Sequence, residues 1–195
     1  MTKKKATELR QEEIIDAALR LVEQQGFDNL SIAGIATAID LVPSAIYRHF
    51  QGKEAIIEGL IEFVGKTLHD NILYVMRAEK ETQKRLKLLL TLHLQFVRSK
   101  RAIPQILFSL LGSDKNVLLK RKILSVIFRY VEQIKDMITE GQSMAEIAPN
   151  VDPKSAAMLF IGLIQPLVIL SQSDDTLIEI YQETSWQIYW RGIAC

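Results

Sequence analysis

The residue types best suited to bind a charged polymer lie close together between positions 41 and 53 of this chain. This stretch carries a tyrosine, an arginine, a histidine and a lysine, at Tyr47, Arg48, His49 and Lys53, and contains no acidic residue. Hydroxyl and cationic groups hydrogen-bond phosphate oxygens, and arginine also pairs with the guanine edge in the major groove of DNA. We therefore expect this segment to contact nucleic acid, provided that the fold places these side chains on one surface.

The sequence around this segment predicts two short helices joined by a tight turn. Ser31 can cap a first helix that runs to Ile39, because apolar residues recur there at three- and four-residue spacing. Asp40 follows at the turn, and aspartate tolerates a left-handed backbone better than most residues. Pro43 suits the start of a second helix that runs to Phe50, since its missing N–H costs nothing there. This is the plan of a helix-turn-helix DNA reader.

The second of these helices should present a mixed polar face. Ile46 and Phe50 lie four residues apart and should both point inward. The positions left to face outward or toward the rim are Ser44, Ala45, Tyr47, Arg48 and His49. Such a mixture of small, aromatic and cationic residues suits a groove lined by base edges and phosphates.

The segment closely resembles the N-terminal domain of the TetR family of bacterial transcriptional regulators. The matching residues are Ile35-Ala36, the run Ile46-Tyr47-Arg48-His49-Phe50 and Lys53-Glu54, with Gly26-Phe27 closing the upstream helix. The chain departs from the family pattern at Asp40, where glycine is usual, and at Val42, where serine or threonine is usual. The second helix should therefore lack a side-chain cap, and Pro43 supplies an alternative helix start.

The resemblance implies a role for each exposed residue of the segment. The expected DNA-backbone contacts are Tyr47, His49 and Lys53. The expected base contacts are Ser44, Ala45 and Arg48, and Ser31 completes the expected DNA-binding set. Arg48 is the residue most apt for guanine. Without its context, the run Tyr47-Arg48-His49 would be interpreted as a solvated helix end. The helix-turn-helix pattern around it is what favours contact with DNA.

The charge of the chain is nearly balanced, which taken alone argues against nucleic-acid binding. The formal charge of the 195 residues is +1, and residues 1–53 carry seven Lys/Arg against seven Asp/Glu. DNA readers often carry a clear basic excess. The positive charge is instead local, in residues 41–53 and in a basic arm at residues 3–5.

The cysteine and histidine content and the hydropathy of the chain argue against a disulfide-bonded protein, a metalloprotein, a membrane protein and an enzyme. The single cysteine, Cys195, permits no intrachain disulfide and no cysteine-based metal site. We expect no metal, no cofactor, no membrane partner and a cytoplasmic location, because the chain shows no signal peptide and its longest apolar run is short and interrupted. The histidines at 49, 69 and 93 lack metal-site spacing, and no phosphate loop, HExxH or GxSxG motif occurs, so we expect no enzyme.

Helical periodicity continues to the end of the chain and predicts an all-α fold in two domains. The resemblance to the TetR family implies that residues 1–53 form a three-helix DNA-binding domain and residues 54–195 a larger effector-binding and dimerisation domain. The predicted helices are 7–25, 31–39, 43–50, 53–76, 79–99, 102–112, 115–141, 152–172 and 174–193. The helix at 53–76 should link the DNA reader to the rest, as a lever.

The second domain offers a set of candidate ligand contacts. These are His93, Phe96, Phe108, Tyr130 and Gln165. A mostly apolar pocket with a few polar anchors favours an elongated or aromatic, largely apolar molecule. For each residue a core role is the alternative: His93 can bond a neighbouring carbonyl, Gln165 can satisfy the backbone freed by Pro166, and the aromatic residues can fill a solid core.

Together these features predict a homodimeric regulator, most simply a repressor released from a near-palindromic DNA operator by a small molecule. The last two predicted helices should form the dimer interface, with core packing as the alternative for their apolar residues: Leu159, Leu163, Leu167, Ile178, Ile188 and Trp190. A rival is a helical interaction protein that keeps the fold without binding an operator, which the balanced charge of residues 1–53 favours. An all-helical enzyme is a more distant rival.

Overall fold

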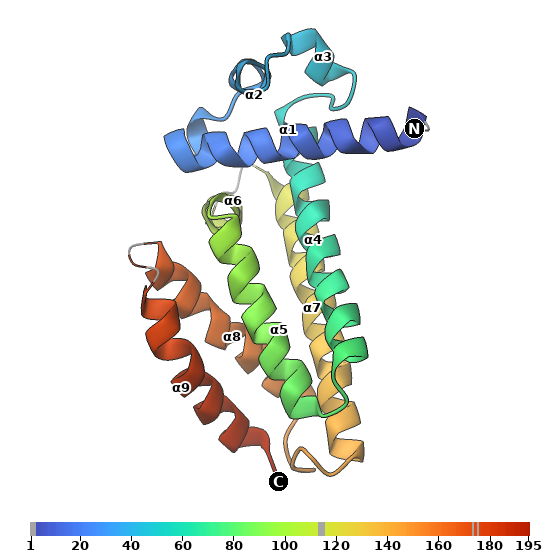
Figure 1. The fold of residues 1–195 in the computed structure, drawn as a ribbon, viewed down its shortest axis with the longest axis vertical. Coiled ribbons are helices and arrows are strands. Elements are labelled where there is room, and N and C mark those ends of the chain that lie inside the picture. Colours follow the sequence, from blue (N-terminus) through green and yellow to red (C-terminus); the bar gives the residue numbers. More distant parts are fainter. Residues whose placement is uncertain (1–2, 113–115, 173, 175) are drawn as a thin grey trace. The chain divides into compact units, whose positions relative to one another are not determined.

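The computed structural model describes the chain apart from residues 1, 2, 113–115, 173 and 175 (Figure 1). The side chains of residues 3–6 and 171 are also outside the description, which includes the predicted basic arm. The helices are α1 (Lys3–Gln25), η1 (Phe27–Asn29, a 3-10 helix), α2 (Ile32–Ala38), α3 (Pro43–Tyr47), α4 (Lys53–Ala78), α5 (Thr82–Ser99), α6 (Ala102–Gly112), α7 (Val117–Ser143), α8 (Pro153–Ser171) and α9 (Thr176–Ile193). Helices thus form nearly all of the described chain, which confirms the all-α prediction.

The helix ends lie within a few residues of those that the sequence predicts. The largest differences are that α1 begins at Lys3 rather than residue 7, that α3 ends at Tyr47 rather than residue 50, and that α5 begins at Thr82 rather than residue 79. The N–H groups of His49 and Phe50 both bond to the carbonyl of Ile46, which closes α3 early. The predicted junctions between helices 102–112 and 115–141 and between helices 152–172 and 174–193 lie outside the described residues.

The chain packs as two compact units. One consists of Met1–Val64 with Lys100–Leu124, and the other of Gly65–Ser99 with Ser125–Cys195. Helices α4 and α7 each contribute residues to both units. This division by packing is distinct from the predicted functional division into 1–53 and 54–195, which stays a prediction.

The first unit is built on the apolar face of α1. Ile14, Ala18 and Val22 are almost completely buried, as their three- and four-residue spacing predicts. Polar contacts fasten α1 to the start of α6: Lys100 Nζ lies 2.6 Å from Asp16 Oδ1. Helix α1 also contacts the short helix α2, and α2 in turn contacts α3.

The second unit buries apolar stripes from five helices. The fully buried residues include Leu86, Leu89, Leu90 and Leu94 on α5, Ile134 on α7, and Phe160 on α8. Helix α9 packs extensively on α8, where Tyr189 Oη donates a 3.0 Å hydrogen bond to the carbonyl of Ala156. Among the described residues, Pro153–Leu170 alone is long and apolar enough to cross a bilayer, a test that core helices of soluble proteins also pass.

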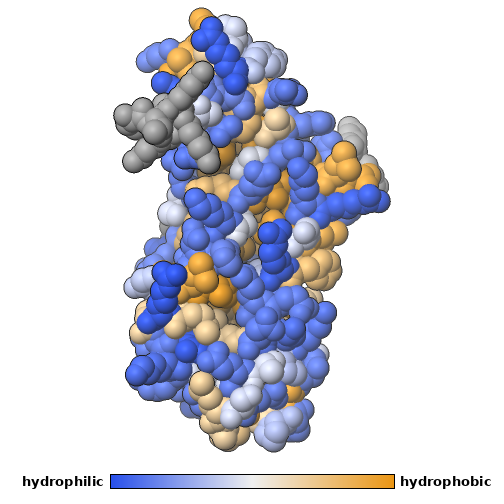
Figure 2. Space-filling view, turned by 90° about the vertical axis from the view of Figure 1, so that its right-hand side faces the viewer, coloured by the Kyte–Doolittle hydropathy of each residue, from blue (hydrophilic) through white to orange (hydrophobic). Residues whose placement is uncertain are grey.

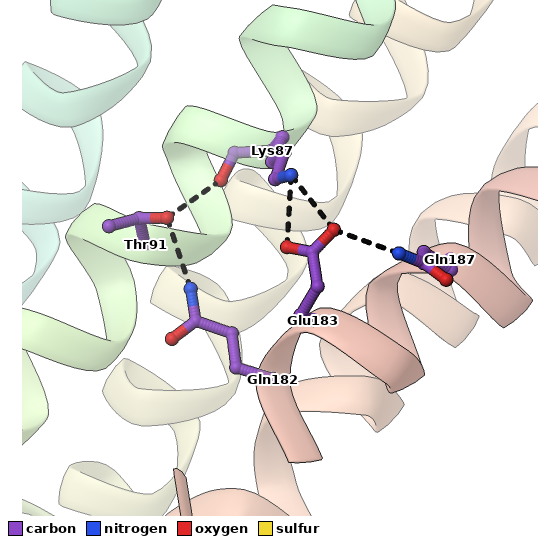
Figure 3. A network of polar contacts seen from close by, with 5 residues as sticks. All are labelled: Lys87, Thr91, Gln182, Glu183 and Gln187. Carbon is purple, nitrogen blue, oxygen red and sulfur yellow. Dashed lines mark hydrogen bonds and ion pairs between the residues drawn. The ribbon is translucent and has the colours of Figure 1, made fainter. Parts of the chain in front are cut away.

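Helices α5 and α9 meet along a polar seam at the surface (Figure 3). Lys87 Nζ lies 2.9 Å from Glu183 Oε2, and Gln182 Nε2 donates to Thr91 Oγ1 at 3.1 Å. Polar residues also dominate another outer face of the molecule, which is mostly hydrophilic with smaller hydrophobic areas (Figure 2). Polar side chains thus gather on the outer faces of the helices.

A buried polar cluster fastens the start of α5 to the loop between α7 and α8. Glu146 Oε2 accepts a 2.6 Å hydrogen bond from the backbone N–H of Thr82, which caps α5. Arg85, 7% exposed, lies 2.9 Å from a carboxylate oxygen of Glu140. Gly141 sits beneath this cluster, where a Cβ atom would lie 2.8 Å from Thr82 Oγ1.

Gly141→Ala should therefore lower the free energy of unfolding by about 1–3 kcal/mol, because the new methyl group overpacks the cluster. Urea unfolding at a fixed protein concentration measures the change. Gly192→Ala is the matched control, since nothing lies within 4 Å of its Cβ position, and it should not destabilise. Equal stability of the two variants would contradict the tight packing at Gly141.

Candidate nucleic-acid interface and ligand site

The turn between α2 and α3 has the backbone geometry that its residues predict. Ser31 Oγ accepts a 3.2 Å hydrogen bond from the N–H of Gly34, so Ser31 caps α2. Asp40 has φ 51°, a left-handed conformation, and the N–H of Leu41 bonds to the carbonyl of Ala36 at 2.8 Å. The predicted cap and the predicted left-handed aspartate are both confirmed.

Helix α3 begins at Pro43 and turns its apolar side inward. Val42 precedes it without a side-chain cap, as expected. Ile46 is completely buried and Phe50 is 7% exposed. Gly59 on α4 lets the Phe50 ring approach closely, since a Cβ there would lie 2.9 Å from Phe50 Cε1. These contacts fix the orientation of α3 within the first unit.

The outer side of α3 carries the residues predicted to face DNA. Tyr47 is 55% exposed, Ser44 and Arg48 are also exposed, and Ala45 and His49 are half-buried. His49 Nδ1 is buried and has no hydrogen-bond partner within the described part of the chain. The structure thus brings a hydroxyl, a phenol and a guanidinium together on one accessible surface, and this surface can hydrogen-bond phosphates and base edges.

Lys53, at the first position of α4, contacts Phe27 of η1. Its ammonium group lies 5.1 Å from the centre of the Phe27 ring and 3.4 Å from the Phe27 carbonyl oxygen. A cation over an aromatic face is held in place by the ring. Sequence reasoning did not assign this role to Phe27, although Gly26-Phe27 is one of the matches to the family pattern. Whether Lys53 also binds phosphate stays a prediction.

The candidate ligand residues are placed in different environments. His93 on α5 and Tyr130 on α7 meet in the second unit, with His93 Nδ1 3.3 Å from Tyr130 Oη. Phe96 is half-buried on α5, in the same unit. Phe108 belongs to the first unit and is 45% exposed, and Gln165 is exposed on α8. The structure therefore brings together His93 and Tyr130, and the ligand role of all five stays a prediction.

Burial changes the acid–base behaviour of the two paired residues. It lowers the pKa of His93 to about 4 and raises the pKa of Tyr130, because the charged form of each loses its hydration. Both are therefore uncharged near neutral pH. Across the described residues, no group of three His, Cys, Asp or Glu side chains is placed to hold a metal ion.

Two family patterns match adjoining parts of the chain. The pattern described as bacterial regulatory proteins, tetR family, matches residues 14–60, and that described as YsiA-like protein, C-terminal region, matches residues 61–181. Among proteins of similar sequence is the nucleoid occlusion factor SlmA of Shewanella sp. strain W3-18-1. It is 30% identical over 158 residues, which cover 80% of this chain and 79% of that protein.

Solved structures of two regulators share the fold. One is the transcriptional regulator FadR from Bacillus subtilis in complex with stearoyl-CoA, at a TM-score of 0.78 and 22% identity, covering 93% of this chain and 98% of that chain. The other is a transcriptional regulator from Saccharomonospora viridis in complex with choline, at a TM-score of 0.81 and 19% identity, covering 96% and 99%. At these identities the likeness shows the fold alone.

The conformation of Asp40 generates a test of the turn. Asp40→Ala should lower the free energy of unfolding by about 1 kcal/mol, because alanine keeps the crowded Cβ and loses the local hydrogen bonding of aspartate. Asp40→Gly should leave the free energy of unfolding unchanged or raise it by up to about 1 kcal/mol. Ala38→Gly, at the end of α2, is the control and should lower the free energy of unfolding by up to about 1 kcal/mol. Denaturant unfolding gives all three values, and a destabilised Asp40→Gly would contradict the strain at this turn.

Proposed function

Because the chain belongs to the TetR family of bacterial regulatory proteins, which are DNA-binding transcriptional regulators, we propose that it is a repressor released from its operator by a small, largely apolar ligand. The observation that carries the DNA part is the outer side of α3, where Ser44, Tyr47 and Arg48 are exposed while Ile46 is completely buried. Regulation of this kind needs no catalytic residue, and we propose that the protein acts in the cytoplasm without enzymatic activity.

The proposed roles of the α3 residues follow from their exposure and chemistry. Arg48, with an exposed fork of N–H donors, reads a guanine, and Ser44 and Ala45 are small enough to let the helix approach the base edges. Tyr47, His49 and Lys53 hold phosphates on either side, with Ser31 at the start of α2. Lys53 is already held near its place by Phe27, so it loses little conformational freedom when DNA binds.

The proposed ligand response uses α4, which is one continuous helix from Lys53 to Ala78. Its early part packs in the unit that carries α3, and its later part packs in the unit that carries His93 and Tyr130. A ligand that binds one of two arrangements of the second unit more tightly would bias α4, and with it the spacing of the two reading heads in a dimer.

The apolar character of the proposed ligand has two sources of support. The interior of the second unit consists mainly of aliphatic and aromatic side chains. The FadR of similar fold was solved with stearoyl-CoA, which has a long apolar chain, although the regulator from Saccharomonospora viridis was solved with choline. Sugars, nucleotides and multiply charged metabolites that carry no apolar chain fit this interior poorly.

A second candidate function is a helical interaction protein that keeps the fold without binding an operator. The balanced charge of residues 1–53 favours this alternative. A DNA reader loses affinity steeply as salt rises, because bound phosphates release counterions. The absence of specific, salt-dependent binding to any DNA sequence would favour the alternative.

A homodimer is the proposed assembly, since one short recognition helix makes too few contacts for tight specific binding. Exposed apolar side chains gather on the outer faces of α8 and α9: Met158, Leu159, Ile169, Leu170, Ile180, Tyr181 and Ile188. Of the residues that the sequence suggested for the interface, Leu159 and Ile188 are exposed here, whereas Leu167 and Ile178 are buried in the core of the second unit. A second copy that covers this surface would remove it from water.

The DNA proposal is tested by comparing two variants on an operator selected from random DNA. Lys53→Ala should weaken binding to all sequences alike and reduce the slope of log affinity against log salt by about one, because one phosphate contact is lost. Arg48→Ala should relax the preference at one operator position at a cost of about 1–3 kcal/mol. Fluorescence anisotropy across a salt series measures both effects.

Phe27→Leu is the control for the DNA test. It removes the aromatic ring beneath Lys53 but keeps the positive charge, so the salt slope should not change even where affinity falls. Equal effects of Arg48→Ala on the operator and on random DNA would refute the assigned role of Arg48.

The dimer proposal is tested by placing a charge on the outer face of α8. Leu159, 65% exposed in the single chain, is suited to this because its replacement disturbs no core contact. Leu159→Glu should raise the dimer dissociation constant by at least about a hundredfold, because each copy would place a carboxylate in the apolar interface that the two copies share. Light scattering measures the mass, and circular dichroism confirms that the helices remain.

Leu118→Glu is the matched control, because Leu118 is 71% exposed on α7 of the first unit. It should leave the dimer intact. A dimer that survives Leu159→Glu but dissociates with Leu118→Glu would place the interface elsewhere.

A further inference from the structure

His93 and Tyr130 form a polar pair inside the second compact unit. The imidazole and phenol rings have their centres 5.6 Å apart, with His93 Nδ1 3.3 Å from Tyr130 Oη. Tyr130 is 3% exposed. His93 as a whole is half-buried, and its imidazole is enclosed enough that burial lowers its pKa. An enclosed ring that retains accessible surface is the arrangement expected of a polar anchor in a mostly apolar site.

The pair holds one more hydrogen-bond donor than its internal contact uses. A neutral histidine has one N–H and a tyrosine has one O–H, and the Nδ1 to Oη contact consumes one of the two hydrogens. If the phenol donates to Nδ1, the N–H at Nε2 remains, and if Nδ1 donates, the phenol O–H remains. No further hydrogen-bond partner of either side chain lies within the described residues, so one donor is left in both cases.

The fully buried residues of the described chain supply no unpaired positive charge. Apart from aromatic side chains, Thr82 and Arg85 are the buried polar residues of the described chain, and Glu140 pairs with the Arg85 guanidinium at 2.9 Å. His93 is itself uncharged near neutral pH, because burial lowers its pKa to about 4. The pair can therefore donate a hydrogen bond to a ligand, and among the described residues the one fully buried cation, Arg85, is already paired with Glu140.

We propose that His93 and Tyr130 together donate a hydrogen bond to an uncharged carbonyl oxygen of the effector, so that the site takes apolar esters, thioesters or ketones and rejects the corresponding carboxylate. The inference rests on the proposed function, since it requires that an apolar effector binds in the second unit. A carboxylate in this interior would lose its hydration and meet no counter-charge, which costs far more than one hydrogen bond returns. An uncharged carbonyl loses less hydration and gains the same bond.

Three probes with the same apolar chain and different head groups test the inference: methyl dodecanoate, dodecanoate and dodecyltrimethylammonium. Each is titrated into the full-length protein near neutral pH, the ester below its solubility limit and the two charged probes below their micelle concentrations, and binding is followed by calorimetry and by release of operator DNA. Methyl dodecanoate should bind at least about tenfold more tightly than either charged probe, and it should release the operator.

Variants of the pair separate ligand recognition from packing. Tyr130→Phe keeps the ring and should weaken ester binding by about threefold, because the His93 N–H can still donate. The double variant His93→Leu, Tyr130→Phe has no donor left and should weaken it by about tenfold without changing the affinity for dodecanoate. Tyr181→Phe, at an exposed tyrosine of α9, is the control and should change neither.

The outcomes distinguish this inference from the proposed function. If none of the three probes binds or releases DNA, both the apolar-ligand proposal and the inference are overturned. If the ester binds and releases DNA but dodecanoate or the ammonium probe binds as tightly, the inference alone is overturned. It is also overturned if Tyr130→Phe and the double variant both lose stability yet keep the preference of the natural protein for the ester, since the pair would then be a core contact.

Discussion

The apolar stripe of α4 is the constraint on which both compact units depend. Ile56 and Leu60 are buried in the first unit, and Leu68, Ile72 and Val75 are buried in the second, all on one continuous helix. The 26 residues of α4 make a helix roughly 40 Å long. Each unit therefore packs its own set of apolar residues against one continuous helix.

Polar groups in the second unit are distributed so that its interior stays uncharged. Glu146 and Glu140 satisfy the start of α5 and the buried Arg85 at one end, and the ion pair of Lys87 with Glu183 lies at the surface (Figure 3). Buried charges are tolerated where they are paired and hydrogen-bonded. With those charges accounted for, the polar groups that remain in the interior include the imidazole of His93 and the hydroxyl of Tyr130, both uncharged near neutral pH.

Much of the DNA-reading segment was predictable from sequence, because its structure depends on residues that are close in the chain. Ser31 caps the helix that follows it, Asp40 takes a left-handed conformation, and Pro43 starts the next helix. The inward side of α3 was predictable for the same reason, since Ile46 and Phe50 lie one helical turn apart and both are buried. Helix ends elsewhere agreed to within a few residues, because apolar periodicity and capping are also local.

The sequence by itself thus determined the helices, their buried stripes and the exposed face of α3, whereas the tertiary structure decided which distant side chains meet. The meeting of His93 with Tyr130, 37 positions apart, and the contact of Lys53 with Phe27, 26 positions apart, were not encoded in any local pattern. Gln165 has the residue type expected of a ligand anchor, yet it is exposed on α8. The physical reason is that periodicity gives the face of a helix on which a residue lies, whereas the packing of the other helices decides what that face touches.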